Sequence, residues 1–299
     1  MAVVVAPVSP AEYDTAARLV CGAAPTFGLE QRVGRFLAAL RGGEVGPAGV
    51  LLARRDGAAV AAAVVQFLPG GTATLLPPTP FAEAEAGDAL AAEIVAQLRT
   101  RNTSFACLFL DPDDTAPADP LVRHGFRSVT RLTHLLRAGG HLPIPPEPPA
   151  DVRFEPADDS SEFGETLLAT YEGTLDVPEV CGHRPAADVL AGYRANQPDP
   201  PMWWLARDPA GRPVGVVLLT HVGTPGVLEL GYLGVVPVAR GRGAGAALLQ
   251  HAVRSAAEIG VPDLTLSVDE RNEPALRLYR RHGFRPYQWQ RVYLWRPAW

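Results

Sequence analysis

A glycine- and arginine-rich segment in the second half of the chain has the composition of an anion-binding loop. It runs from Arg240 to Ala246 and joins an expected strand, 228–236, to an expected helix, 243–259. Glycines turn the backbone tightly and leave amide hydrogens uncovered, while a helix N-terminus adds about half a positive charge. Arg240 and Arg242 add cations that can form charge-assisted hydrogen bonds. The segment predicts a pyrophosphate site, with a loop that satisfies only its own turn as the alternative.

The same glycines fit a rival motif. Gly241, Gly243 and Ala246 have the spacing of a dinucleotide-binding fingerprint, and Asp269 ends the next expected strand. Only about thirty residues follow Asp269, too few for the further βαβ units that this fold requires. The loop also begins several residues after its strand, beyond Pro237. We therefore set the dinucleotide fold aside.

A second group of residues shares one face of an expected helix. Asn272, Ala275 and Tyr279 are three and then four residues apart, so they lie on one face over roughly 10 Å. Asn272 suits the N-cap and Pro274 the first turn. A small alanine between an amide and a phenol leaves room for a slender ligand arm. The alternative is an ordinary capped helix whose tyrosine packs in the core.

Together these groups resemble the signatures of the GNAT acetyltransferase superfamily, whose members transfer an acyl group from acyl-CoA to an amine. The likeness covers residues 152–296 well and the first half of the chain weakly. The matching residues of the loop signature are Val235, Pro237, Arg240, Gly241, Gly243 and Gly245, and those of the helix signature are Asn272, Ala275, Tyr279, Gly283 and Phe284.

The resemblance implies acetyl-CoA as a cosubstrate and no metal. Main-chain groups of β-strand residues 233–235 would pair with the pantetheine arm, and the amides of 240–246 would hold the pyrophosphate. Asn272 would bond the pantetheine, and Tyr279 would protonate the departing thiolate. The pKa values of a phenol and a thiol lie near 10 and 8.5, so a positioned phenol can stabilise the thiolate by hydrogen bonding and supply a proton that solvent replaces. The implied cofactor-binding residues are Leu233, Gly234, Val235, Arg240, Gly241, Arg242, Gly243, Ala244, Gly245, Ala246, Asn272, Ala275 and Tyr279.

A glutamate on the strand before the loop is the candidate general base. Glu229 precedes Val235 by six residues, a spacing that resembles the general-base glutamate of histone-type members. Strand alternation puts positions 229, 231, 233 and 235 on one face unless a bulge intervenes. The alternative is an ordinary exposed strand glutamate.

The acceptor wall of the resembled family corresponds here to residues 171–179. Glu172, Asp176 and Glu179 lie there near a glycine turn and would suit a cationic amine. A solvated acidic loop is the alternative for this segment.

The order of expected elements repeats along the chain. The pentapeptide Arg-His-Gly-Phe-Arg at 123–127 recurs 158 residues later. We expect an α/β (α+β) protein with two tandem GNAT-like domains, each a mixed, mostly antiparallel sheet flanked by helices. The predicted parts are a degenerate domain at 1–138, a proline-rich linker at 139–151 and a catalytic domain at 152–299.

The first half lacks the residues of the predicted site. Segment 81–87 carries Glu83 and Glu85 where the second half has two arginines, so it would repel a pyrophosphate. Leu121 stands opposite Tyr279, and Asp114 opposite Asn272. We therefore expect this half not to bind CoA.

Composition excludes several function classes. The chain has 299 residues, a net charge of −5 and no lysine, which rules out a Schiff-base or pyridoxal phosphate enzyme and argues against nucleic-acid binding. Three well-separated cysteines fit reduced thiols, and no long apolar tract predicts a membrane span. We expect a cytoplasmic monomer or homodimer.

The expected activity is an N-acetyltransferase in the C-terminal domain. Acetyl would pass from acetyl-CoA to a primary amine of a small molecule by direct attack in a ternary complex. The alternatives are a protein or peptide N-acetyltransferase and a non-catalytic acyl-CoA-binding sensor.

Overall fold

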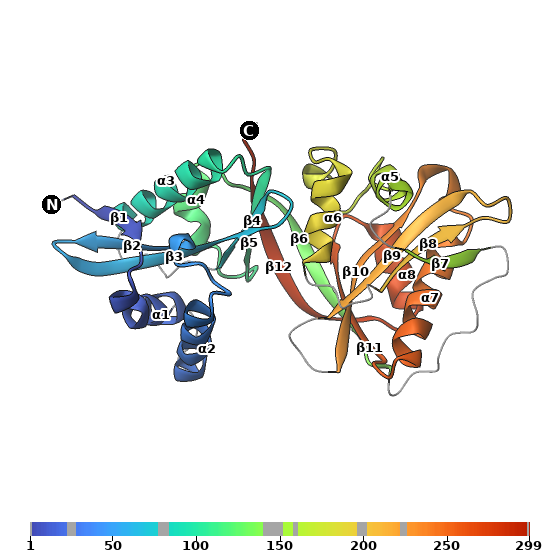
Figure 1. The fold of residues 1–299 in the computed structure, drawn as a ribbon, viewed down its shortest axis with the longest axis horizontal. Helices are drawn as coiled ribbons and strands as arrows, with labels where there is room; N and C mark the ends of the chain where they lie inside the picture. Colours follow the sequence, from blue (N-terminus) through green and yellow to red (C-terminus); the bar gives the residue numbers. More distant parts are fainter. Residues whose placement is uncertain are drawn as a thin grey trace. The chain divides into compact units, whose positions relative to one another are not determined.

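The described residues form two compact units. Unit 1 comprises Met1–Val129 and Arg291–Trp299, and unit 2 comprises Thr130–Gln290. The predicted linker, apart from Gly139, lies outside the described residues, and the domain boundaries drawn from the sequence stay a prediction. The computed structural model describes residues 2–22, 28–76, 84–139, 152–157, 161–195, 202–221, 226–297 and 299 (Figure 1).

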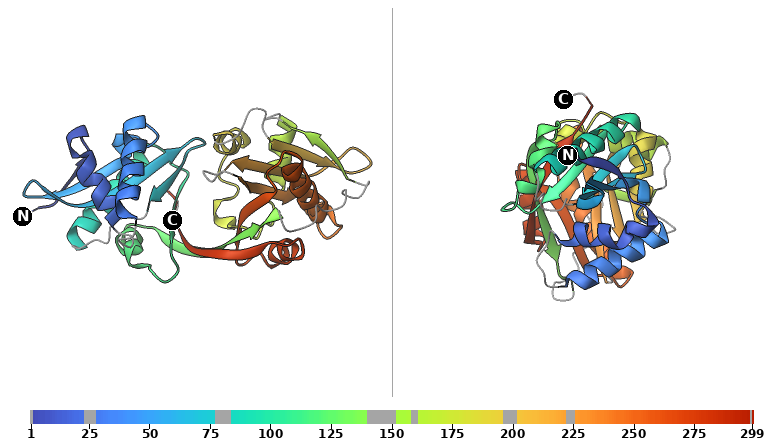
Figure 2. Two further views of the ribbon diagram at one scale, coloured as in Figure 1. Left: turned by 90° about the horizontal axis from the view of Figure 1, so that it is seen from below. Right: turned by 90° about the vertical axis from the view of Figure 1, so that its left-hand side faces the viewer.

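Unit 1 is a mixed sheet between two layers of helices. Its strands in sheet order are β1 (Val4–Pro7), β2 (Val50–Arg55), β3 (Ala58–Leu68), β4 (Thr72–Leu76), β5 (Phe105–Leu110) and the end of β12 (Arg285–Trp295). Its helices are α1 (Tyr13–Gly22), α2 (Leu29–Gly42), α3 (Ala84–Thr100) and α4 (Asp119–Arg123), with short 3₁₀ turns η1 (Pro10–Glu12), η2 (Pro47–Gly49) and η3 (Ala116–Ala118). Helices α1 and α2 pack on one face, and α3 and α4 on the other (Figures 1 and 2).

Unit 2 has the same plan. In sheet order its strands are the start of β12, β6 (Arg127–Arg137), β11 (Asp263–Asp269), β10 (Val227–Val235), β9 (Pro213–His221), β8 (Met202–Arg207) and β7 (Arg153–Pro156). Its helices are α5 (Ser161–Ala169), α6 (Ala186–Arg194), α7 (Ala244–Glu258) and α8 (Glu273–Arg281), with η5 (Pro178–Val180) and η6 (Pro237–Ala239). Helices α7 and α8 pack on one face, and α5 and α6 on the other.

Each sheet contains one parallel pair, β4 with β5 in unit 1 and β10 with β11 in unit 2. The other registered pairs are antiparallel. The predicted class, a mixed and mostly antiparallel sheet flanked by helices in each half, is therefore confirmed.

Each unit includes a strand segment that comes from the other part of the sequence. Residues Arg291–Trp295 of β12 pair with β5 in unit 1, although they end the chain. In unit 2, β6 pairs with β11 through the register Arg137↔Leu264 to Leu132↔Asp269, although it directly follows unit 1 in sequence. The strand that follows the first half of the chain therefore contributes side chains to unit 2.

Among the described residues, no helix is long and apolar enough to cross a membrane.

Candidate active site

Strands β10 and β11 separate after a short parallel contact. Their register joins Val227–Glu229 to Asp263–Thr265, and in the described part of the chain no pairing continues beyond it. A bulge follows, because Leu230 pairs with Leu219 and Tyr232 with Leu218, which leaves Gly231 as an extra residue. The main chain of β10 on the β11 side is therefore open from Leu230 onward.

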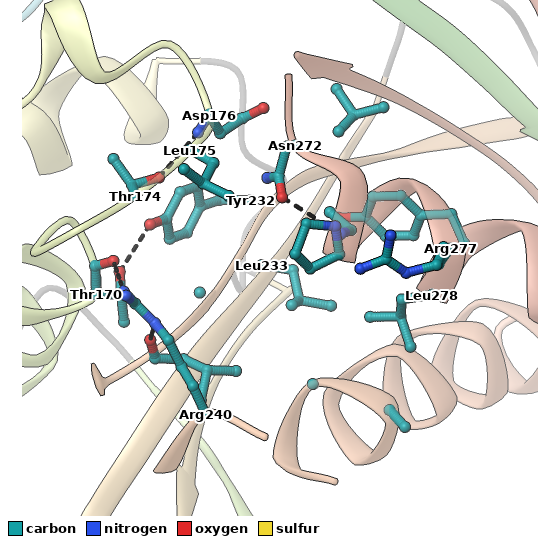
Figure 3. A pocket seen from close by; sticks show the side chains of 18 of the residues that line it. Thr170, Thr174, Leu175, Asp176, Tyr232, Leu233, Arg240, Asn272, Arg277 and Leu278 are labelled. Atoms are coloured by element: carbon teal, nitrogen blue, oxygen red, sulfur yellow. Dashed lines mark hydrogen bonds between the residues drawn. The ribbon is translucent and has the colours of Figure 1, made fainter. Parts of the chain in front are cut away.

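This opening holds a cavity of about 670 Å³ (Figure 3). Four segments line it: the loop after α5, the second part of β10, the turn before α7, and α8 with the end of β11. The sequence-predicted residues that it brings together are Leu233, Gly234, Val235, Arg240, Gly241, Gly243, Gly245, Ala246, Asn272, Ala275, Tyr279 and Asp176. Those outside the lining are Arg242, Ala244, Glu229, Glu172 and Glu179.

The turn before α7 presents a run of unbonded amides. Gly241 and Gly243 have φ angles of 74° and 90°, in the left-handed region that favours glycine. The amides of Arg240 and Ala246 donate to the chain itself, at 3.2 and 3.0 Å. Within the described residues, the amides from 241 to 245 have no acceptor. In the predicted pyrophosphate site, the central amides are therefore available to a ligand, and the amides of the two end residues are already hydrogen-bonded.

The side chain of Arg240 is turned toward the protein. Its Nη2 donates to the carbonyl oxygen of Thr170 at 2.9 Å, and its Nε to that of Val235 at 3.1 Å (Figure 3). A longer bond of 3.4 Å reaches the carbonyl oxygen of Gly173. These bonds tie the end of α5 to the turn. Arg242, by contrast, is exposed, and no partner for it exists among the described residues.

Tyr279 also lines the cavity. Its side chain is 8% exposed and packs against Phe284, with ring centroids 5.7 Å apart. Burial, and then the negative charge of Asp176, raise the pKa of the phenol above its usual value, so it stays protonated at neutral pH. Its hydroxyl makes no hydrogen bond to any described residue. The proton of Tyr279 is therefore available to a ligand atom.

Asn272 caps α8 as predicted, because its Oδ1 accepts from the amide of Ala275 at 3.3 Å. Its side chain also hydrogen-bonds Asp176. Asp176 is largely buried and accepts the amide of Asp269 at 2.8 Å, and desolvation raises the pKa of its carboxyl. The amide of Asn272 is thus held in place at the cavity wall.

The three predicted acceptor carboxylates do not converge. Glu179 forms an ion pair with Arg271 through contacts of 2.8 and 2.9 Å, which hold its pKa below the usual value. Glu172 is exposed and lines a separate cavity of about 440 Å³. Only Asp176 faces the main cavity. The helical turn at 178–180 separates these side chains, which sequence spacing alone did not indicate.

Glu229 is half-buried and has no hydrogen bond or ion pair among the described residues. Burial raises the pKa of its carboxyl. Leu228 and Leu230 pack against α7, and so do Leu233 and Val235, so Glu229 points to the opposite face. A bulge at Gly231, the exception that the sequence analysis allowed for, shifts the alternation by one residue, so Glu229 does not share a face with Leu233 and Val235.

Sequence reasoning missed Ser267 and Tyr232, which also line the cavity. The Tyr232 hydroxyl hydrogen-bonds Thr170 Oγ1 at 2.7 Å. Ser267 Oγ hydrogen-bonds His134 at 2.8 Å. No local signal reveals the second contact, since it joins residues that are far apart in sequence and depends on the β6–β11 pairing.

The first half presents no comparable chemistry at the matching positions. Leu121 is buried in the core of unit 1, Asp114 is exposed, and Glu85 is paired with Arg55. Residues 81–83 of the segment opposite the anion-binding turn lie outside the described residues. Among the described residues of both units, no group of three or more His, Cys, Asp or Glu side chains could hold a metal ion.

The fold and cavity are those of an acyl-CoA-dependent acetyltransferase family. The family described as "Acetyltransferase (GNAT) family" matches residues 167–284. The peptidyl-lysine N-acetyltransferase YjaB of Escherichia coli (strain K12) is 34% identical over 127 residues, which are 42% of this chain and 77% of that protein. The chain belongs to the GNAT acetyltransferase family, which implies acetyl-CoA as its cosubstrate.

The mycothiol acetyltransferase of Arthrobacter sp. (strain FB24) is 29% identical over 177 residues, 56% of this chain and 54% of that protein. The match therefore spans about half the length of this relative. Among solved structures, a tandem GNAT protein from the clavulanic acid biosynthesis pathway aligns over 98% of both chains with a TM-score of 0.56 and 16% identity. The two-unit fold is that of tandem GNAT proteins, as predicted.

Proposed function

We propose that unit 2 transfers the acetyl group of acetyl-CoA to a primary amine of a small molecule, by direct attack in a ternary complex. One observation carries this proposal: a single cavity joins the unbonded amides of residues 241–245 to the free hydroxyl of Tyr279, along the open edge of β10. This arrangement suits a long coenzyme with a diphosphate at one end and a thioester at the other.

The pyrophosphate binds the amides of the turn before α7. The turn combines uncovered N–H groups with the positive end of a helix, which is a favourable site for an anion. The pantetheine arm then runs along the main chain of Leu233–Val235 on its side toward β11, as an added strand would, because the described β10–β11 pairing covers only Val227–Glu229. Ala275, between Asn272 and Tyr279, leaves the space that this arm occupies.

Tyr279 donates a proton to the departing thiolate. Its raised pKa keeps the phenol protonated, and its hydroxyl, which has no hydrogen-bond partner in the described part of the chain, is available to the ligand. The amine must in turn lose protons. Glu229, half-buried and without a cationic partner in the described part of the chain, has a pKa raised toward neutrality and serves as the base that deprotonates the incoming ammonium, directly or through water.

The acceptor is a small amine. The mycothiol acetyltransferase match supports an acceptor of the mycothiol type, and the separation of Glu172 and Glu179 leaves Asp176 as the carboxylate that faces the cavity. The match to a peptidyl-lysine N-acetyltransferase favours a second candidate, a lysine side chain of a peptide.

An amine panel tests the proposal. The full chain is assayed for release of the CoA thiol with spermidine, glucosamine, a cysteinyl aminosugar, kanamycin and a lysine peptide. Tyr279→Phe should lower kcat on the best amine about a hundredfold and leave the dissociation constant for acetyl-CoA within threefold. The matched control is Tyr293→Phe, a similarly buried tyrosine of unit 1, which should change neither value. Tight acetyl-CoA binding without turnover on any amine would favour the sensor alternative.

A further inference from the structure

A chain of polar side chains leads away from the cavity across the face of the sheet opposite α7. It begins at Ser267 on β11, which lines the cavity together with Tyr279. Ser267 Oγ lies 2.8 Å from His134 Nδ1 on the neighbouring strand β6. His134 Nε2 in turn lies 2.8 Å from Gln290 Oε1 on β12. The three side chains form one hydrogen-bonded line, with one end at the cavity.

The partners fix which nitrogen of His134 carries the proton. Gln290 faces Nε2 with its amide oxygen, which can only accept, so Nε2 is the protonated nitrogen. Nδ1 is then an acceptor, and the Ser267 hydroxyl donates to it. The serine oxygen keeps its lone pairs for a group in the cavity. This is the arrangement of a base that acts through a hydroxyl.

The surroundings of His134 keep it neutral. Burial lowers the pKa of the imidazole, and the hydrogen bond to Gln290 opposes this to a smaller extent. Two titratable groups lie near His134 on the neighbouring strands. One is Tyr287 of β12, whose ring centroid lies 6.1 Å from that of the imidazole. The other is Glu229 of β10, which is paired with Thr265 of β11. No charged group shifts its pKa. A neutral imidazole at physiological pH is able to accept a proton.

Acetylation of an ammonium group removes two protons from the nitrogen. Glu229 accepts the first of these protons before the nitrogen attacks. The second leaves as the N–C bond forms, when the amine nitrogen sits at the thioester carbonyl. Ser267 lines the same cavity as Tyr279, and Glu229 does not line it. A side chain that accepts the second proton needs an atom on the cavity wall, and Ser267 supplies one.

We propose that Ser267 and His134 form a proton relay for the attacking amine, an inference that rests on the proposed acetyl transfer. As the amine nitrogen bonds to the carbonyl carbon, its proton passes to Ser267 Oγ while the serine proton passes to His134 Nδ1. The C–S bond then breaks and the thiolate takes the proton of Tyr279. The phenolate regains a proton from solvent, and the imidazolium and Glu229 release theirs to solvent, so that one proton is released for each ammonium acetylated. Gln290 holds the imidazole in the productive tautomer and acts as a positioning residue.

Variants of the relay test it on the panel amine that the wild type acetylates fastest. His134→Ala should lower kcat at least 30-fold, with KM for acetyl-CoA within threefold, because the lost group acts only on the amine. Added imidazole should restore at least a tenth of the rate, and the restored rate should rise with the neutral fraction of imidazole. Ser267→Ala should cause a similar loss, and the double variant should be no slower than either single variant, since the two residues act as one unit.

Two controls separate this inference from its premise. His124→Asn in unit 1 and Ser255→Ala on α7 lie outside the cavity lining and should leave kcat unchanged. A wild type that acetylates no amine would overturn the proposed function. If the wild type is active and the kcat of His134→Ala lies within threefold of the wild-type kcat, the relay alone is overturned. The relay is also overturned if imidazole does not restore the lost activity of His134→Ala while its circular dichroism spectrum and acetyl-CoA binding remain normal.

Discussion

Arg240 and Thr170 are 70 residues apart, yet the guanidinium Nη2 of the first donates to the carbonyl oxygen of the second over 2.9 Å. This bond links the end of α5 to the anion-binding turn. Close packing reinforces it, because a Cβ on Gly234 would lie 2.5 Å from Thr170 Oγ1. The turn before α7 and the loop after α5 are therefore connected through the side chain of Arg240.

Loss of this link should cost stability as well as affinity. Arg240→Ala removes hydrogen bonds to Thr170, Val235 and Gly173, and we expect the free energy of unfolding to fall by about 1 kcal/mol. The dissociation constant for acetyl-CoA should rise three- to tenfold, because the turn loses its support. Arg242→Ala is the matched control, since that side chain is exposed and has no partner among the described residues. Equal unfolding midpoints for the two variants would contradict the link.

The glycines of the turn should be needed for their backbone conformation. Gly241 and Gly243 have positive φ angles, and a Cβ at either would meet nothing within 4 Å. Alanine there costs about 1–2 kcal/mol by backbone strain, which realigns the amides. We expect each substitution to weaken acetyl-CoA binding at least tenfold in calorimetry. Gly211→Ala has the same strain at φ 82° and the same open space, but lies outside the cavity lining, so it should lower stability and leave the affinity unchanged.

The sequence identified the parts of this site that depend on local chemistry. The helix at 243–259 was expected from periodicity and is observed at Ala244–Glu258, and the N-cap role of Asn272 follows from its hydrogen bond to Ala275. Each of these features is determined by residues within a few positions of one another. Periodicity, glycine spacing and capping residues are therefore sufficient to predict them.

The features that sequence did not reveal depend on contacts between distant segments. The Gly231 bulge places Leu233 and Val235 on the face opposite to that of Glu229, because β9 and β10 pair around one extra residue. The sequence allowed for a bulge in this strand but did not locate it, because its position depends on the register between two strands. His134 reaches Ser267 only because β6 joins β11. The pairing of Glu179 with Arg271 likewise depends on a loop meeting the end of another strand.

Glu229 should show its role in a pH–rate profile. Burial raises the pKa of this carboxyl, so the fraction able to accept a proton increases with pH through a value above that of an ordinary glutamate. We expect Glu229→Gln to lower the rate mostly at low pH, where the amine is fully protonated and most needs a base. At high pH, free amine is available and the deficit should narrow. Rates are to be compared from pH 5.5 to 9.5 with acetyl-CoA saturating. A profile of unchanged shape would remove Glu229 from the mechanism.

A half-buried histidine outside the cavity lining should make the fold sensitive to acid. His251 stacks on Phe154, with ring centroids 4.1 Å apart, and meets Trp204 edge-on at 5.0 Å. Its Nε2 has no hydrogen-bond partner in the described structure. Burial lowers the pKa of His251 to about 4, so the unfolded chain binds the proton more readily than the folded one. Stability from this residue is present above the unfolded pKa of about 6.5 and is lost as pH falls toward 4.

Urea unfolding of the wild type between pH 7.5 and 4.5 measures this effect. The contribution of His251 should be about 1 kcal/mol of destabilisation at pH 5, after allowance for screening of a partly exposed ring. His251→Phe preserves the stacking shape and cannot be protonated, so it should reduce the pH dependence in this range. The control is His221→Phe at an exposed strand end, which should retain the full pH dependence of the free energy of unfolding. If His251→Phe and the wild type lose stability in parallel as the pH falls, another group is responsible for the acid sensitivity.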